Sequence, residues 1–103
     1  MPFEWHGLRF EGPLRHPGEL EAQGGVYTIW CWRGNGWAIL DIGEAGDIRA
    51  RVLSHDRKDC WRQQCAAEIN YAAHYTPGLD ETGRRRLETQ FRAIEHPPCG
   101  EVY

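Results

Sequence analysis

Two runs of β-branched and aromatic residues, separated by a short glycine-containing turn, constrain the fold of this chain most. The runs cover residues 24–32 and 37–43, and the sequence between them is Arg-Gly-Asn-Gly. Such a pattern is typical of an antiparallel β-hairpin. We therefore predict a hairpin that closes near residues 33–36. Its open end then brings Tyr27 roughly opposite Asp41.

Both faces of the predicted hairpin carry apolar side chains. In the first strand Val26 and Trp30 share one face, and Tyr27 and Ile29 share the other. This predicts a sheet that is covered on both sides, with the hairpin in a central position. Asp41 is the exception, a carboxylate among hydrophobic neighbours. It either caps the turn that follows or serves as a functional acid.

Helical signals and one further strand follow the hairpin. Asp47 is a natural N-cap for a helix through residues 48–55, and residues 56–66 read as a short helix or ordered loop. Residues 67–75 could form a third strand or extend the helix. The alternation of Ile69, Tyr71 and Ala73 favours the strand, although the alanines suit a helix. The chain is thus expected to be an α+β protein with a small antiparallel sheet of about three strands flanked by helices.

The last predicted element is a longer helix that Asp80 caps and that runs to about Glu95. Its buried stripe is expected to be Leu87, Phe91 and Ile94. Arg84, Glu88 and Arg92 recur at a spacing of four residues, and this pattern is typical of a plain exposed helix face.

At 103 residues the chain is expected to form one domain. Residues 24–103 would make up the domain, and residues 1–23 an N-terminal extension with an edge strand and a loop. No apolar run reaches the length of a membrane span, and the N-terminus lacks the apolar core of a signal peptide. We therefore expect a cytoplasmic protein without a membrane partner.

The four cysteines are interpreted as free thiols, because the chain does not resemble a short cysteine-dense secreted scaffold. A zinc site is the alternative. The spacings Cys60-x4-Cys65 and His96-x2-Cys99 differ from the tight pairs of common zinc modules, so no structural zinc is expected.

The formal net charge of −3 argues against an obligate nonspecific nucleic-acid binder, whose affinity comes from neutralising phosphates. Basic residues do cluster in residues 49–62 and in 84–86, and on charge alone we interpret both clusters as solvated helix faces. Tryptophans are numerous. Packing in the core is their expected role, and stacking on unpaired bases is the alternative.

In order and spacing, the motifs of this chain resemble the GIY-YIG nuclease family. Gly25-Val26-Tyr27 stands in the place of the first motif and Asp41-Ile42-Gly43 in the place of the second. The other matching positions are Arg51, His55 one turn later, Glu88 on the last helix, and the closing Pro97-Pro98-Cys99-Gly100.

The resemblance implies metal-dependent hydrolysis of phosphodiester bonds, that is, cleavage or nicking of DNA. Glu88 would hold Mg2+ or Mn2+, which polarises the phosphate. Tyr27 would help activate the water, Arg51 would neutralise the developing negative charge, and His55 would assist proton transfer. Targeting would come from residues 1–23 or from a protein partner.

Two positions depart from the family's pattern. Asp41 replaces the tyrosine of the second motif, and Gly100 stands where an asparagine is expected. Two alternatives follow. Asp41 could join Glu88 as a second metal ligand in a working nuclease, or the chain could be a catalytically silent module of the same fold that binds nucleic acid or a protein. An unrelated small α/β protein is a third.

Overall fold

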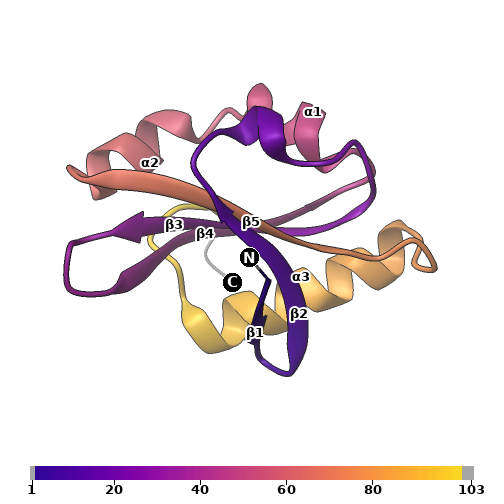
Figure 1. Cartoon of the computed structure of the whole chain (residues 1–103). Coiled ribbons are helices and arrows are strands. Elements are labelled where there is room, and N and C mark those ends of the chain that lie inside the picture. Colours follow the sequence, from indigo (N-terminus) through magenta and orange to yellow (C-terminus); the bar gives the residue numbers. More distant parts are fainter. Residues whose placement is uncertain (1, 101–103) are drawn as a thin grey trace.

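The computed structural model describes residues 2–100, so the last three residues of the expected domain lie outside it. The protein is α+β, with a five-stranded antiparallel sheet and three α-helices in the described part (Figure 1). The elements in chain order are β1 (Phe3–Trp5), β2 (Leu8–Leu14), a 3-10 helix (Pro17–Glu19), β3 (Gly25–Trp32), β4 (Trp37–Ala45), α1 (Ile48–Leu53), α2 (Lys58–Gln64), β5 (Glu68–Tyr75) and α3 (Glu81–Glu95).

The sheet order is β1-β2-β5-β3-β4. The prediction of about three strands was too low, because residues 3–14 form a hairpin of their own whose second strand pairs with β5. The predicted hairpin exists as β3 and β4, and residues 68–75 form the predicted third strand. β4 was expected to be central, but it lies at the edge of the sheet.

A bulge in β4 changes the register of the hairpin. The pairing steps from Trp30 with Ile39 to Ile29 with Asp41, which leaves Leu40 as the extra residue. A bulge of one residue reverses the alternation of the residues that follow it. Asp41 therefore turns to the face of β3 that carries Tyr27. The expected pairing is off by two residues, since Tyr27 lies opposite Gly43.

Helices cover both faces of the sheet, as the apolar pattern of the hairpin predicted. In Figure 1, α1 and α2 lie on one side and α3 on the other. Tyr27, Ile29 and Trp61 belong to the core on the side of α1 and α2. Val26 and Phe91 belong to the core on the side of α3.

The two predicted N-caps are confirmed. The Asp47 side chain accepts a hydrogen bond from the backbone N–H of Ala50 at 3.0 Å, and that of Asp80 accepts one from the N–H of Gly83 at 2.9 Å. The predicted stripe of α3 was partly wrong. Phe91 is buried, but Ile94 is 60% exposed, and Arg92 occupies a buried position instead.

The cysteines form two disulfides, Cys31–Cys65 and Cys60–Cys99, so the prediction of free thiols was wrong. The partners are 34 and 39 residues apart in the sequence, and only the fold brings them together. Disulfides persist mainly in oxidising compartments. The two disulfides therefore argue against the expected cytoplasmic location. No helix within residues 2–100 is long and apolar enough to cross a membrane.

Candidate active site

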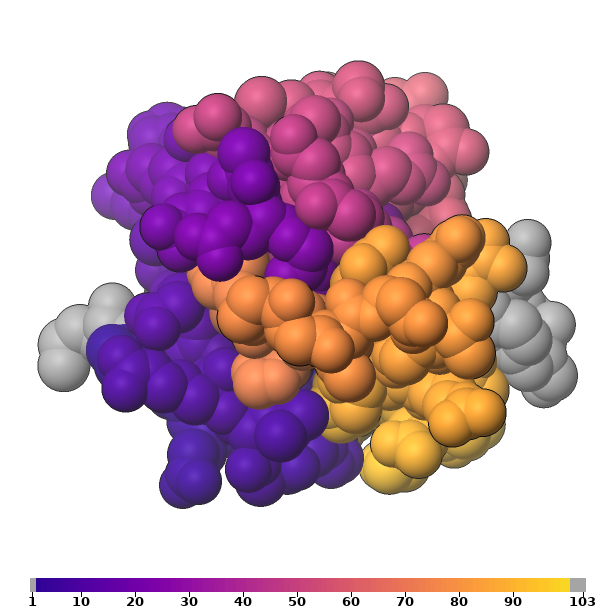
Figure 2. Space-filling model, turned by 90° about the vertical axis from the view of Figure 1, so that its right-hand side faces the viewer, coloured from indigo at the N-terminus to yellow at the C-terminus, as the bar shows by residue number. Residues whose placement is uncertain are grey.

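A cleft of about 590 Å3 lies beside the edge strand β4. Three of the five predicted site residues, Tyr27, Arg51 and Glu88, line it together. They come from β3, α1 and α3, which are distant in the sequence. Figure 2 shows the α1 and α2 region, in pink, meeting α3, in orange to yellow, on one face of the molecule. The full lining is Tyr27, Gly43, Glu44, Arg51, Arg57, Arg85, Glu88, Thr89 and Arg92.

Gly43 allows Tyr27 to reach the cleft. The two residues lie opposite each other in the hairpin, and a Cβ atom at position 43 would overlap the phenol of Tyr27. The Tyr27 side chain therefore packs directly over Gly43. Any other residue at position 43 would push the phenol out of this place.

His55 lies behind Tyr27 and holds its hydroxyl. Nε2 of His55 is 2.6 Å from the Tyr27 oxygen, and Nδ1 accepts the backbone N–H of Arg57 at 3.0 Å. Burial, helped by the nearby Arg57 and Arg51, lowers the pKa of His55 to about 4. The ring is thus neutral at neutral pH, and with Nδ1 accepting, its single proton sits on Nε2 and is donated to Tyr27.

These contacts and the burial of Tyr27 determine the protonation state of its phenol. Burial raises the pKa of the phenol well above its usual value, so Tyr27 keeps its proton at neutral pH. Because the oxygen already accepts a hydrogen bond from His55, the phenol proton is free to be donated elsewhere. A hydrogen-bond acceptor bound in the cleft could receive this proton, because Tyr27 lines the cleft.

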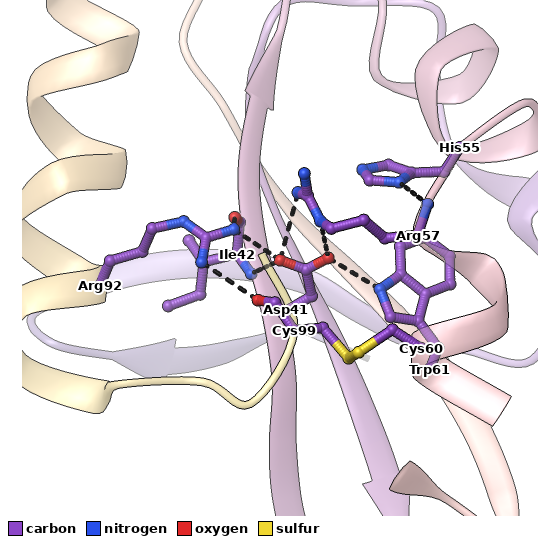
Figure 3. The surroundings of a disulfide bond; sticks show 8 residues. All are labelled: Asp41, Ile42, His55, Arg57, Cys60, Trp61, Arg92 and Cys99. Carbon is purple, nitrogen blue, oxygen red and sulfur yellow. Dashed lines mark hydrogen bonds and ion pairs between the residues drawn. A yellow bond between two sulfur atoms is a disulfide. The ribbon is translucent and has the colours of Figure 1, made fainter. Parts of the chain in front are cut away.

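Asp41 lies beneath the cleft, not in its lining, and is completely buried. Its carboxylate accepts hydrogen bonds from Arg92 Nη2 at 2.6 Å, Arg57 Nε at 2.7 Å and Trp61 Nε1 at 2.7 Å. Figure 3 shows the two guanidinium groups approaching it from opposite sides. Asp41 does not cap the turn after β4. Within residues 2–100 its side chain accepts one backbone hydrogen bond, from the N–H of Ile42.

Arg92 is the principal site residue that sequence reasoning missed. The expected exposed ladder on α3 was wrong, because the Arg92 side chain is only 3% exposed and that of Arg84 15%. Besides Asp41, Arg92 donates to the carbonyl oxygens of Ile42 and Cys99 and to Glu88. A buried carboxylate needs a cation. Asp41 in an apolar strand was therefore the signal that could have pointed to a buried arginine.

Gly100 makes room for Arg92. The backbone at Gly100 has a φ of +107°, and a Cβ atom there would overlap the Arg92 guanidinium. The two departures from the GIY-YIG pattern are thus linked in space through one residue. Asp41 binds the Arg92 guanidinium, and Gly100 leaves the volume that this guanidinium fills.

Glu88 is the carboxylate best placed to hold a metal ion. Its side chain is 18% exposed and its Oε2 accepts from Arg92 Nε at 3.1 Å. Burial raises the pKa of Glu88, and the contact with Arg92 opposes that shift. The other carboxylate of the lining, Glu44, pairs through both oxygens with Arg84 and Arg85.

Within residues 2–100 no group of three or more His, Cys, Asp or Glu side chains could enclose a metal ion. Mg2+ does not require such a cage, because it commonly keeps several waters and binds one or two carboxylates together with substrate phosphates. Glu88, open to the cleft and held on one side by Arg92, fits that mode of binding.

Arginines outnumber glutamates in the lining of the cleft, and Asp41 beneath it pairs with two of them, Arg57 and Arg92. Four arginines and two glutamates line it. Guanidinium groups present forked donors that match phosphate oxygens. The arrangement is therefore suited to hold a phosphate group against the phenol of Tyr27 and the carboxylate of Glu88.

No protein family, curated protein or solved structure matches this chain.

Proposed function

We propose that this chain is a divergent member of the GIY-YIG nuclease family that hydrolyses phosphodiester bonds of DNA with Mg2+ or Mn2+. One observation carries the proposal. Tyr27, Arg51 and Glu88, which match three separate family motifs, line a single arginine-rich cleft. The family's active site would require this convergence.

The residues of the cleft then have distinct roles in binding the phosphate and the metal ion. Arg51, whose side chain is 38% exposed, and Arg57 bind the nonbridging oxygens of the phosphate and offset the charge that develops there. Glu88 holds the metal ion. A bound ion would polarise the phosphate and stabilise the leaving oxygen.

Tyr27 acts as a phenol and not as a phenolate, because its pKa is raised. It donates its proton to the attacking water or to a phosphoryl oxygen and thereby orients the reacting group. His55 positions Tyr27. For His55 to accept a proton on Nε2, the ring would have to move its own proton to Nδ1 and break the contact with the Arg57 N–H.

Asp41 supports the site without contacting the substrate. It anchors Arg57 and Arg92, two of the four arginines of the cleft, at fixed positions. Arg92 in turn fixes one oxygen of Glu88. We therefore assign to Asp41 the orientation of cations, and not the binding of the metal.

The second candidate is a catalytically silent module that binds DNA. The excess of arginines in the cleft and the ion pair of Glu88 with Arg92 favour it, since both suit an anion held without a metal. DNA is the expected partner under either candidate. Residues 1–23 or a protein partner would supply the targeting.

The decisive experiment measures nicking of supercoiled and branched DNA with Mg2+ or Mn2+. Glu88→Gln should lower the rate at least about 100-fold, the scale of losing one key polar group of an active site. Glu95→Gln is the matched control, because Glu95 lies on the same helix outside the cleft lining and should keep full activity.

Two results would contradict this proposal, the first its mechanism and the second its activity. Unchanged cleavage by Glu88→Gln would exclude the assigned mechanism. Absence of cleavage on every substrate, combined with salt-sensitive DNA binding that Arg51→Ala weakens, would establish the silent module instead.

A further inference from the structure

A second hollow, which we call the α3 groove, adjoins the cleft on the outer side of α3. It measures about 500 Å3 and is lined by Thr82, Arg85, Arg86, Thr89 and Gln90. Arg85 and Thr89 also line the cleft. The two hollows therefore share part of their lining and lie next to each other along the helix. In Figure 2 this part of α3, in orange, lies on the open surface of the molecule.

The chemistry of the α3 groove is that of an anion site. Its lining, as described, holds two guanidinium groups, two hydroxyls and one amide, and no carboxylate. Arg85 pairs with Glu81 at 2.7 Å, so part of its charge is already compensated. Arg86 is exposed and makes no ion pair within residues 2–100. Arg86 is thus the group in this groove most available to a phosphate.

The helix sets the spacing of the polar side chains that line the α3 groove. Thr82, Arg86 and Thr89 stand at i, i+4 and i+7 and share one face of α3. With a rise of 1.5 Å per residue they span about 10 Å. This length is comparable to a few successive phosphates, which lie about 3.4 Å apart along the axis of a duplex strand.

We propose that the α3 groove binds a phosphate adjacent to the one in the cleft, on the same nucleic-acid strand, with Arg86 as its principal contact. The inference rests on the proposed function, since it extends the same bound strand. It also gives a substrate class. The cleft would hold the phosphate that is cleaved, and the cleft and groove together would select an oligonucleotide over a single phosphodiester.

The test uses the Glu88→Gln protein without divalent metal, so that binding is measured apart from cleavage. One ligand is a thymidine dinucleotide with a single phosphodiester, followed by chemical-shift titration. The other is a labelled oligothymidylate of about ten nucleotides, within the usual site sizes of single-strand binders, followed by fluorescence anisotropy.

Arg86→Ala should weaken binding of the longer ligand about tenfold, the scale of one charge-assisted contact. It should also reduce the slope of log affinity against log salt by about 0.7, as expected for one single-strand phosphate contact. Binding of the dinucleotide should not change. Arg86→Lys should retain the salt slope, because it keeps the charge.

Arg33→Ala is the matched control, since Arg33 is an exposed arginine in the turn between β3 and β4, outside the lining of both hollows. If Arg86→Ala and Arg33→Ala bind the longer ligand equally, with equal salt slopes, the α3 groove is not a phosphate site. If neither ligand binds the Glu88→Gln protein at all, the proposed function itself is wrong and this inference falls with it.

Discussion

Nη2 of Arg92 lies 2.6 Å from Oδ1 of Asp41, and their side chains are 3% and 0% exposed. The pair joins α3 to the edge strand β4 across 51 residues of sequence. It forms the base of the cleft, because Arg92 also contacts Glu88 in the lining. The structure of the site therefore depends on a buried charge pair that no short sequence motif describes.

Replacing Asp41 should destabilise the fold strongly. Asp41→Ala would leave Arg92 buried without its carboxylate, and loss of one partner of a buried pair costs about 3–5 kcal/mol of unfolding free energy. Denaturant unfolding measures the change. Asp59→Ala is the control, because the Asp59 side chain is 88% exposed. Equal stabilities of the two variants would show that the buried pair is not needed.

His55 should make the protein less stable as the pH falls. Its pKa is about 4 in the folded protein and 6.5 in a free side chain. Between these values the unfolded chain binds a proton that the folded protein does not, so stability is lost as pH decreases through this window. The loss amounts to about 3 kcal/mol, at 1.36 kcal/mol per pKa unit.

Unfolding experiments at pH 6.5 and pH 4 test this, because His55→Gln should lose about 3 kcal/mol less than the wild type over that range. Carboxylates common to both proteins cancel in the comparison. The exposed His16 provides the control, and His16→Gln should follow the wild-type curve. If the stability of His55→Gln falls with pH as much as that of the wild type, then His55 is not buried as a neutral ring.

Gly100 should tolerate a side chain less well than Gly34. Both residues have a positive φ, +107° and +85°, so alanine is strained at either position. Only at Gly100 does the added Cβ meet another group, the Arg92 guanidinium; at Gly34 nothing lies within 4 Å. Gly100→Ala should therefore cost about 1–3 kcal/mol more than Gly34→Ala in chemical unfolding, the usual scale of overpacking. Equal costs would argue against the tight approach of Arg92.

The two disulfides should contribute strongly to the stability of the protein. They close loops of 34 and 39 residues, and each should contribute about 3–4 kcal/mol by restricting the unfolded chain. Paired serine substitutions, Cys31→Ser with Cys65→Ser and Cys60→Ser with Cys99→Ser, measure each contribution. Thiol titration of the unreduced, denatured protein should find no free thiol. Four reactive thiols would contradict both bonds.

The sequence alone predicted one hairpin and the starts of two helices. The Gly-Asn turn predicted the hairpin, and Asp47 and Asp80 predicted the starts of two helices, because these signals act between residues only a few positions apart. The resemblance to the GIY-YIG family picked out Tyr27, Arg51 and Glu88, and these three residues do line one cleft. Their nuclease chemistry remains a prediction.

The tertiary structure decided the rest of the site. The bulge at Leu40 places the Asp41 side chain on the same face of the sheet as Tyr27. The buried carboxylate of Asp41 binds Arg92, a residue that the helix pattern had predicted to be exposed. The cysteine pairs likewise formed only when β3, α2 and the segment after α3 came together. Local propensity cannot determine such pairings, because their energy arises between groups that are tens of residues apart and meet only in the folded chain.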